Sequence, residues 1–111
     1  MEVKAIAKYI GISPQKLRLV AEMVRGKDVE EALAILRLYR TPSSRAIAKV
    51  IKSASANAEN NYQMSVSELK VTRLVIDQAS TLKRIRAQAR GRVSPILRHS
   101  SHITATVDSE A

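Results

Sequence analysis

The sequence predicts an α+β protein, with a small antiparallel three-stranded sheet packed on three helices and a long protruding β-hairpin. Three observations lead to this expectation. Strand-like patterns stand near both ends of the chain and in its second half, whereas helical periodicity fills the region after the first strand. An unusually long connection separates the last two strand patterns. The length of 111 residues is that of one domain, so we expect a single domain over 1–111.

The chain opens with a predicted strand and a predicted helix. Residues 3–12, VKAIAKYIGI, alternate loosely between apolar and polar side chains, which favours a strand. Ser13 and Pro14 then supply an N-cap and a first helical residue that needs no hydrogen-bond donor. The predicted helix covers 13–25, and Gly26 is suited to end it. Its apolar stripe consists of Leu17, Val20, Ala21 and Val24.

A second helix is predicted over 28–39. Asp28 is a favourable N-cap, and Glu31 stands three residues later, which is the spacing of a capping box. The residues expected to face the core are Ala32, Leu33, Ile35 and Leu36.

A third helix is predicted over about 42–60. Thr41-Pro42 repeats the combination of a cap and a proline, and Asn60-Asn61 is expected to end the helix. Small residues in SASANA would allow close packing against another element. The expected core face consists of Ile47, Val50, Ile51, Ala54 and Ala58.

Two strand patterns follow in the second half of the chain. Residues 69–76, LKVTRLVI, are rich in β-branched side chains. Residues 101–107, SHITATV, alternate cleanly. One face of the latter strand would carry Ile103, Ala105 and Val107, and the other His102, Thr104 and Thr106.

The connection between these strands is too long to remain within a compact body. Asp77 to Gly91 spans 14 residues, and the return to Val107 is similar. Each leg would reach roughly 45 Å when extended, whereas the radius of gyration of a compact domain of this size is about 13 Å. We therefore expect a protruding hairpin with its tip near Arg90-Gly91-Arg92, although a solvated surface loop is the alternative. The expected parts are a globular body, 1–77 and 100–111, and an extended arm, about 78–99.

Charge is distributed unevenly along the chain. The net charge is +9, from 19 basic and 10 acidic residues. Residues 1–77 hold 13 basic and 8 acidic side chains, whereas residues 78–107 hold 6 basic and no acidic ones. Such an excess usually indicates a polyanionic partner, most often nucleic acid.

The composition of the arm narrows the kind of polyanion. A peptide lying on a membrane would need an apolar face, but the apolar residues here are sparse. Recognition of single-stranded RNA typically uses aromatic platforms, which residues 78–107 lack. Contact with the backbone of folded RNA or of DNA remains, with arginine binding phosphate. The apolar runs are short and no signal peptide is recognisable, so we expect a soluble cytoplasmic protein without a membrane partner.

Other functional classes receive little support. The chain has no cysteine, and His99 and His102 have no acidic neighbour to complete a metal site, so we expect neither metal nor cofactor. A helix-turn-helix over 13–39 is disfavoured, because its second helix would present D-V-E-E to DNA. No nucleophile elbow or phosphate-binding glycine loop is present, which argues against an enzyme.

A second basic group surrounds the first predicted helix. Its members are Lys16, Arg18, Arg25 and Lys27. They are equally compatible with a solvated helix face and with a further phosphate-binding surface. Lys49 and Lys52 on the third helix are weaker candidates.

Five stretches together resemble the bacterial large-subunit ribosomal protein L-twenty-two family. They are ISPQKLRLVAEMVRGKDVEEALAIL (12–36), SASANAENN (53–61), LKVTRLVID (69–77), LKRIRAQARGRVSPI (82–96) and SHITATV (101–107). The resemblance covers nearly the whole chain in the right order. It implies a structural constituent of the large ribosomal subunit, with a small body on the subunit surface and a hairpin that passes through ribosomal RNA and supports assembly.

The resemblance also implies partners and site residues. The partners would be large-subunit ribosomal RNA, neighbouring ribosomal proteins and, near the hairpin tip, the nascent peptide in the exit tunnel. Changes at the tip in this family are associated with an altered macrolide response. The implied RNA-binding residues are Ser13, Gln15, Lys16, Arg18, Arg25, Lys83, Arg84, Arg86, Arg90, Arg92, Arg98, His99, Ser101 and His102. The implied tunnel tip is Gln88, Ala89, Arg90, Gly91 and Arg92.

The sequence departs from the family pattern beside the tip. Ala87-Gln88 stands where many relatives have Pro-Arg, and Arg90 follows two places later. The basic charge is therefore shifted, and the turn is less stiff without the proline. A non-ribosomal basic nucleic-acid-binding protein remains the alternative function.

Overall fold

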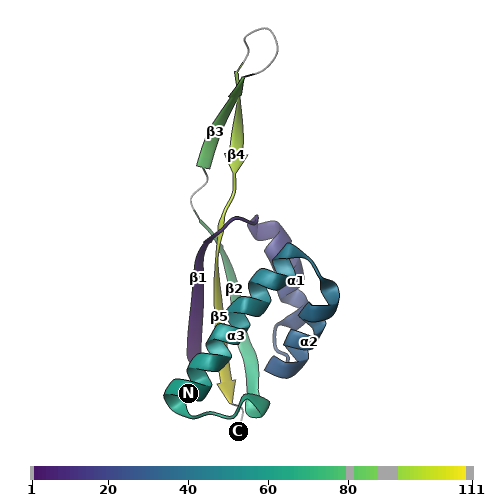
Figure 1. The fold of residues 1–111 in the computed structure, drawn as a ribbon, viewed down its shortest axis with the longest axis vertical. Coiled ribbons are helices and arrows are strands. Elements are labelled where there is room, and N and C mark those ends of the chain that lie inside the picture. The colour runs from purple at the N-terminus through teal and green to yellow at the C-terminus, as the bar shows by residue number, and fades with distance from the viewer. Residues whose placement is uncertain (1, 80–81, 88–92, 110–111) are drawn as a thin grey trace.

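The computed structural model describes residues 2–79, 82–87 and 93–109, and it confirms the predicted fold class (Figure 1). Three helices and a three-stranded antiparallel sheet form the body, and two further strands form a separate ribbon. The elements are β1 (Val3–Ile10), α1 (Pro14–Val24), α2 (Val29–Tyr39), α3 (Pro42–Tyr62), the short 3-10 helix η1 (Val66–Glu68), β2 (Leu69–Gln78), β3 (Leu82–Ala87), β4 (Val93–Arg98) and β5 (Ser101–Ser109).

The C-terminal strand β5 lies in the middle of the sheet. The strand order is β1-β5-β2, and β5 is antiparallel to both neighbours. Ala105, for example, pairs with Ala5 of β1 on one side and with Leu74 of β2 on the other. β1 and β2 are therefore the two edges of the sheet, and the ends of the chain must meet before the sheet is complete.

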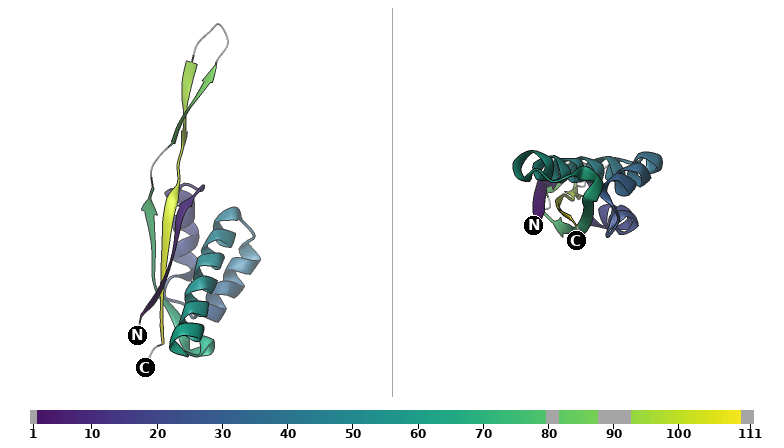
Figure 2. Two further views of the ribbon diagram at one scale, coloured as in Figure 1. Left: turned by 60° about the vertical axis from the view of Figure 1, so that its left-hand side comes forward. Right: turned by 90° about the horizontal axis from the view of Figure 1, so that it is seen from below.

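Helices α1, α2 and α3 lie on one face of the sheet, and no helix in the described part of the chain covers the other face (Figure 2). α3 packs on β1 and β5, α1 packs on β2, and α2 packs mainly on α3. The core between them is aliphatic, as a chain without Phe or Trp requires. The predicted stripes of α1 and α3 are fully buried, and in α2 Ala32 and Leu36 are buried while Leu33 and Ile35 pack against the core.

Two predicted details of the helix ends are wrong, although Asp28 is the N-cap of α2 as predicted. Asp28 is the N-cap of α2 but its side chain makes no capping hydrogen bond, so no capping box with Glu31 forms. The backbone of Asp28 instead takes part in a tertiary contact, an isolated antiparallel bridge to Lys70 of β2. The predicted stop at Asn60-Asn61 is also wrong. α3 continues to Tyr62, and Gln63 ends it in the left-handed conformation at φ 53°.

Two strand details also differ from expectation. β1 ends at Ile10 and not at residue 12, after a register shift between Ala7 and Ile10 that includes Tyr9 at φ 56°. Thr106, expected on the polar face of β5, is only 1% exposed. It lies where β2 contains a bulge between Val71 and Arg73, and the Thr72 hydroxyl donates to the Thr106 carbonyl at 3.2 Å.

β3 and β4 form an antiparallel ribbon that extends beyond the sheet (Figures 1 and 2). Their register runs from Leu82 opposite Arg98 to Ala87 opposite Val93. At its base, the amide of Ala79 donates to the carbonyl of Ser100 at 2.9 Å, just beyond the end of β2. The radius of gyration is 17.0 Å and the longest dimension is 64 Å, compared with a radius of about 13 Å for a compact domain of this size.

Candidate nucleic-acid interface

Three arginine side chains gather along the open edge of β2. Arg18 belongs to α1 and Arg25 is the C-cap residue directly after that helix, and both reach the same strand. The Arg18 Nη2 donates to the carbonyl of Ile76 at 3.1 Å. The Arg25 Nε and Nη2 both donate to the carbonyl of Leu74, at 3.3 and 2.8 Å. These contacts satisfy carbonyl groups that an edge strand would otherwise leave unpaired.

Arg73 completes this group, although the sequence analysis did not single it out. It lines a groove of about 330 Å³ together with Arg18 and Arg25, and Glu22 lies in the same groove. Strict alternation would place Arg73 on the core face with Val71, but the bulge between them reverses the pattern, so Val71 is buried and Arg73 exposed. In the sequence, the only indication that Arg73 faces outward is that it is a basic residue within an apolar strand pattern.

The guanidinium groups keep donors for a further partner. Each arginine has five N–H donors, of which these contacts use one in Arg18 and two in Arg25. All three arginine side chains are exposed. A phosphate in the groove could therefore accept hydrogen bonds from arginines that already have a fixed position.

The first turn of α1 presents the other predicted body residues. Gln15 and Lys16 are exposed, and Ser13 is half-buried at the N-cap. The Ser13 side chain makes no capping hydrogen bond, and the first turn holds no acidic residue. This helix end is therefore positively polarised and not neutralised by its own sequence.

Two predicted RNA-binding residues, Ser101 and His102, lie at the junction between the sheet and the ribbon, and their surroundings differ. Ser101 is fully buried, and its hydroxyl donates to the Ile12 carbonyl at 2.7 Å, which ties β5 to the loop before α1. His102 is half-buried, and its Nδ1 accepts from the Tyr9 amide at 3.1 Å. The Tyr9 ring meets the imidazole edge to face, with centroids 4.9 Å apart. Because Nδ1 accepts this hydrogen bond, the neutral form of the imidazole would carry its proton on Nε2.

The remaining predicted residues belong to the arm. His99 is exposed between the ribbon and β5. Lys83, Arg84 and Arg86 belong to β3, and Arg98 belongs to β4. The residues of the predicted tip lie outside the described part of the chain: Gln88, Ala89, Arg90, Gly91 and Arg92.

Among residues 2–79, 82–87 and 93–109, no three His, Cys, Asp or Glu side chains gather into a group that could hold a metal ion. No helix among them combines the length and the apolar character needed to cross a bilayer.

Comparison with known proteins gives a consistent result over nearly the whole chain. The family model described as ribosomal protein L22p/L17e matches residues 5–108. A Dehalococcoides mccartyi protein named large ribosomal subunit protein uL22 is 57% identical over 107 residues, which are 96% of this chain and 98% of the relative. Proteins of the same name are 50% identical in Desulforamulus reducens (99% and 97% covered) and 52% identical in Herpetosiphon aurantiacus (97% and 96% covered).

Proposed function

The chain belongs to the ribosomal protein L22p/L17e family, and from this premise we propose that it is a structural constituent of the large ribosomal subunit. The family is structural and non-enzymatic, and the protein is not an enzyme. Its place of action is the ribosome, in the cytoplasm, and its partners include ribosomal RNA and neighbouring ribosomal proteins.

Large-subunit ribosomal RNA is the principal ligand in this proposal. The observation that carries it is the absence of any acidic residue from Gln78 to Val107, a segment with six basic residues that includes the β3–β4 ribbon. A ribbon of two strands has little core of its own, so an enclosing RNA would supply the contacts that hold it. Its cations would neutralise phosphates without reading base sequence.

The body adds a second contact surface, which we name the α1 surface. It consists of Ser13, Gln15, Lys16, Arg18, Arg25 and Arg73. Two observations support this surface as an RNA contact: the groove beside β2 and the first turn of α1, which has no side-chain cap. At the junction, His99 and His102 are proposed as further contacts, whereas buried Ser101 is given an indirect role in positioning the loop before α1.

The tip of the arm is proposed to line the nascent-peptide exit tunnel. This proposal rests on the family resemblance of residues 82–96, and the tip itself is the segment from Gln88 to Arg92. On this view the nascent peptide passes beside Arg90 and Gly91. The ribbon supports the proposal to the extent that a long projection from the body is needed to reach a distant part of the subunit.

Sedimentation tests the assignment to the subunit. A tagged copy is expressed in a bacterial host, and the lysate is separated on a sucrose gradient in high salt. The expected result is co-migration with the large subunit after the wash, together with ultraviolet crosslinks that map to large-subunit RNA. Release to the top of the gradient, while the host protein stays bound, would instead support a non-ribosomal nucleic-acid-binding protein that uses the same arm.

A further inference from the structure

The β2 edge of the body sheet is closed by other parts of the chain. The Gly26 amide donates to the Val71 carbonyl and the Val71 amide donates to the Lys27 carbonyl, each at 2.9 Å. Further along the strand, the carbonyls of Leu74 and Ile76 accept from arginine side chains of the α1 surface. A further strand could not pair with β2 without displacing these hydrogen bonds.

The β1 edge is open by comparison. The Lys4 carbonyl accepts from the side-chain amide of Asn57 on α3 at 3.4 Å, which is long for such a bond. In an antiparallel pair, alternate residues direct their backbone groups toward and away from the neighbouring strand, so Ile6 shares the outward direction of Lys4. No residue in the described part of the chain bonds to the Ile6 amide or carbonyl from that side. Ile6 therefore offers one donor and one acceptor to a strand of another chain.

A groove of about 240 Å³ follows this edge between β1 and α3. On the β1 side it is lined by Ala5 and Ala7, whose small side chains leave room, and on the α3 side by Ala46, Lys49 and Val50. A strand added to β1 would direct every second side chain toward α3, on the same face as Ala5 and Ala7. An aliphatic side chain of that strand would therefore enter the groove.

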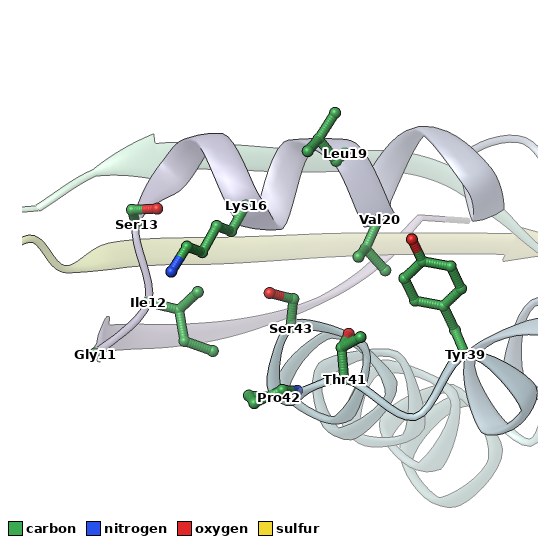
Figure 3. Close-up of a pocket in the computed structure, with 10 residues that line it drawn as sticks. All are labelled: Gly11, Ile12, Ser13, Lys16, Leu19, Val20, Tyr39, Thr41, Pro42 and Ser43. Atoms are coloured by element: carbon green, nitrogen blue, oxygen red, sulfur yellow. The ribbon is translucent and has the colours of Figure 1, made fainter.

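A larger pocket of about 480 Å³ continues the line of this groove (Figure 3). Its residues Gly11 and Ile12 follow β1 directly, and Pro42 and Ser43 begin α3, so it lies between the same two parts of the chain. Figure 3 shows β1 reaching Gly11 near the first turn of α3. An extended segment laid along β1 would therefore have room to continue past the end of the strand.

The charges along the β1 edge favour an acidic segment. Lys4 and Lys8 are exposed on β1, and Lys49 is exposed on the α3 wall of the groove. No carboxylate lines the groove among the described residues, and the nearest acidic residue along the chain is Glu2, which precedes β1. Carboxylates on a strand beside β1 would form pairs of opposite charge with these lysines, and such pairs stabilise a sheet.

Two other occupants fit this edge less well. If a second copy paired antiparallel about Ile6, Lys4 of each chain would lie opposite Lys8 of the other, and like charges directly opposite destabilise a sheet. RNA could bind the lysines through its phosphates. However, a phosphate oxygen only accepts hydrogen bonds, so it would leave the Ile6 carbonyl without a donor and the apolar groove unfilled.

We propose that β1 is a site of strand addition for another protein, and that the added segment is extended and alternates aliphatic with acidic side chains. Its backbone pairs with Ile6, an aliphatic side chain enters the groove beside Lys49, and its carboxylates lie next to the lysines of β1. The proposal goes beyond the proposed function, because this edge belongs neither to the arm nor to the α1 surface and its occupant is not RNA.

Nuclear magnetic resonance of the isotope-labelled full-length protein tests the site with defined peptides. The probe is a short capped peptide in which valine and glutamate alternate, and the matched probe has lysine in place of each glutamate. The glutamate peptide should shift the amide signals of Lys4 and Ile6 and bind about tenfold more tightly than the lysine peptide.

Methylation of the peptide backbone separates strand pairing from charge attraction. In the proposed geometry the glutamate amides face β1 and the valine amides face away from it. N-methyl groups on the glutamate residues should therefore weaken binding by about tenfold, whereas N-methyl groups on the valine residues should not.

Matched variants locate the site on the protein. Lys49→Glu reverses the charge at the groove, and Lys52→Glu makes the same change at an exposed position of α3 that does not line it. Ser53→Leu fills the groove from α3, and Asn60→Leu adds the same side chain at an exposed position nearer the end of this helix. Both groove variants should bind the glutamate peptide about tenfold more weakly, and both controls should bind it as the parent does. Thermal unfolding shows that each variant is folded.

Four results would overturn the proposal. The first is that the glutamate peptide leaves the Lys4 and Ile6 signals unchanged or binds no more tightly than the lysine peptide. The second is that the two methylated peptides bind alike. The third is that the parent sediments as a dimer that Ser53→Leu dissociates, which would make a second copy the occupant. The fourth is that the groove variants, and not their controls, lose affinity for large-subunit ribosomal RNA, which would make this edge an RNA contact.

The proposed function is tested separately, by binding of the parent protein to large-subunit ribosomal RNA. If the parent binds this RNA and the glutamate peptide fails, only the strand-addition site is wrong. If the peptide binds at β1 and the RNA does not bind, only the proposed function is wrong.

Discussion

Arg18 and Arg25 each have two roles: they donate hydrogen bonds to the backbone of β2, and they belong to the surface that is proposed to contact RNA. Arg18 and Arg25 donate to successive outward carbonyls of β2, at Ile76 and Leu74. An apolar side chain could pack there but could not donate to these carbonyls. Because a carbonyl at an exposed edge can also bond to water, the contribution of each contact to stability is modest.

The first prediction concerns Arg25. Replacing Arg25 by Met retains much of the apolar stem and removes both donors to Leu74, so we expect the free energy of unfolding to fall by about 0.5–1.5 kcal/mol. Urea denaturation at moderate salt measures this. Lys27→Met is the control, because Lys27 is a nearby exposed cation. Equal losses in the two variants would mean that overall charge, and not the bonds to Leu74, determines stability here.

The second prediction concerns the buried hydroxyl of Ser101. Ser101→Ala removes the donor to the Ile12 carbonyl and leaves that carbonyl without its partner. The expected loss is about 1–3 kcal/mol, measured by thermal or urea unfolding. Ser53→Ala, at an exposed position of α3, should stay within about 0.5 kcal/mol of the parent. If the free energy of unfolding of Ser101→Ala also stayed within about 0.5 kcal/mol of the parent, the bond from Ser101 to Ile12 would not stabilise the fold.

At the scale of elements, the helix starts differ in how their amides are satisfied. α3 has a complete capping box, in which the Ser44 amide donates to the Thr41 hydroxyl at 3.1 Å and the Thr41 amide donates to the Ser44 hydroxyl at 2.9 Å. α1 begins at Ser13 without any side-chain capping bond. α2 also lacks a side-chain capping bond at Asp28, but its first turn carries Glu30 and Glu31, whereas the first turn of α1 carries no acidic residue. The helix start that has neither a side-chain cap nor an acidic first turn is therefore the one in the α1 surface.

The third prediction compares these two caps. Thr41→Ala should cost about 1 kcal/mol of stability in the free protein, and Ser13→Ala should cost clearly less because no capping bond is lost. Chemical denaturation without RNA gives both values. Conversely, Ser13→Ala should weaken RNA binding more than Thr41→Ala. Equal destabilisation by the two substitutions would show that Ser13 caps α1 in solution.

The fourth prediction concerns the cations of the arm. If all six basic residues from Lys83 to Arg98 meet phosphates, log affinity for ribosomal RNA should fall with log salt at a slope of roughly −4 to −5 from these residues alone. Replacing Arg84, Arg90 and Arg92 by Ala should flatten this slope by about 2 and leave the body folded. The matched control removes three helical cations, Arg37, Arg45 and Lys52. A slope that changes only in the control would place the contact on the helices.

At the scale of the whole molecule, the protein contains two sheets of different size, the three-stranded sheet of the body and the two-stranded ribbon of β3 and β4. The ribbon lies between β2 and β5 in the sequence. β5 pairs on both sides and is covered by helices on one face, whereas β3 and β4 pair only with each other in the described part of the chain. Stability should therefore be concentrated in the body, with the ribbon stabilised by its partner. This arrangement supports the proposed division into a body and an arm.

The fifth prediction follows from this arrangement. In the free protein, amides of β5 between Ile103 and Val107 should exchange slowest, and those of β3 and β4 should exchange many times faster. Addition of large-subunit ribosomal RNA should slow exchange in the ribbon more than in β5. Hydrogen exchange followed by mass spectrometry measures both. Strong protection of β3 and β4 without RNA would show that the ribbon is stable by itself.

The sequence by itself determined the features that depend on one segment at a time. Apolar spacing gave the buried stripes of α1 and α3, alternation gave the core face of β5, and the acid-free stretch after Asp77 indicated the arm. These signals are local, because helical and strand periodicities are set by the geometry of a single segment. The family resemblance used the same segments taken together in their order.

Only the tertiary structure decided which distant segments meet. It placed β5 in the centre of the sheet, turned Arg73 outward at a bulge to join Arg18 and Arg25, and brought Lys16 and Ser43 to the wall of one pocket. It also moved the predicted end of α3 and removed the predicted capping box at Asp28. The physical reason is that strand order, register and side-chain convergence depend on contacts between residues far apart in the chain, such as the 93 positions between Tyr9 and His102, and no local pattern encodes them.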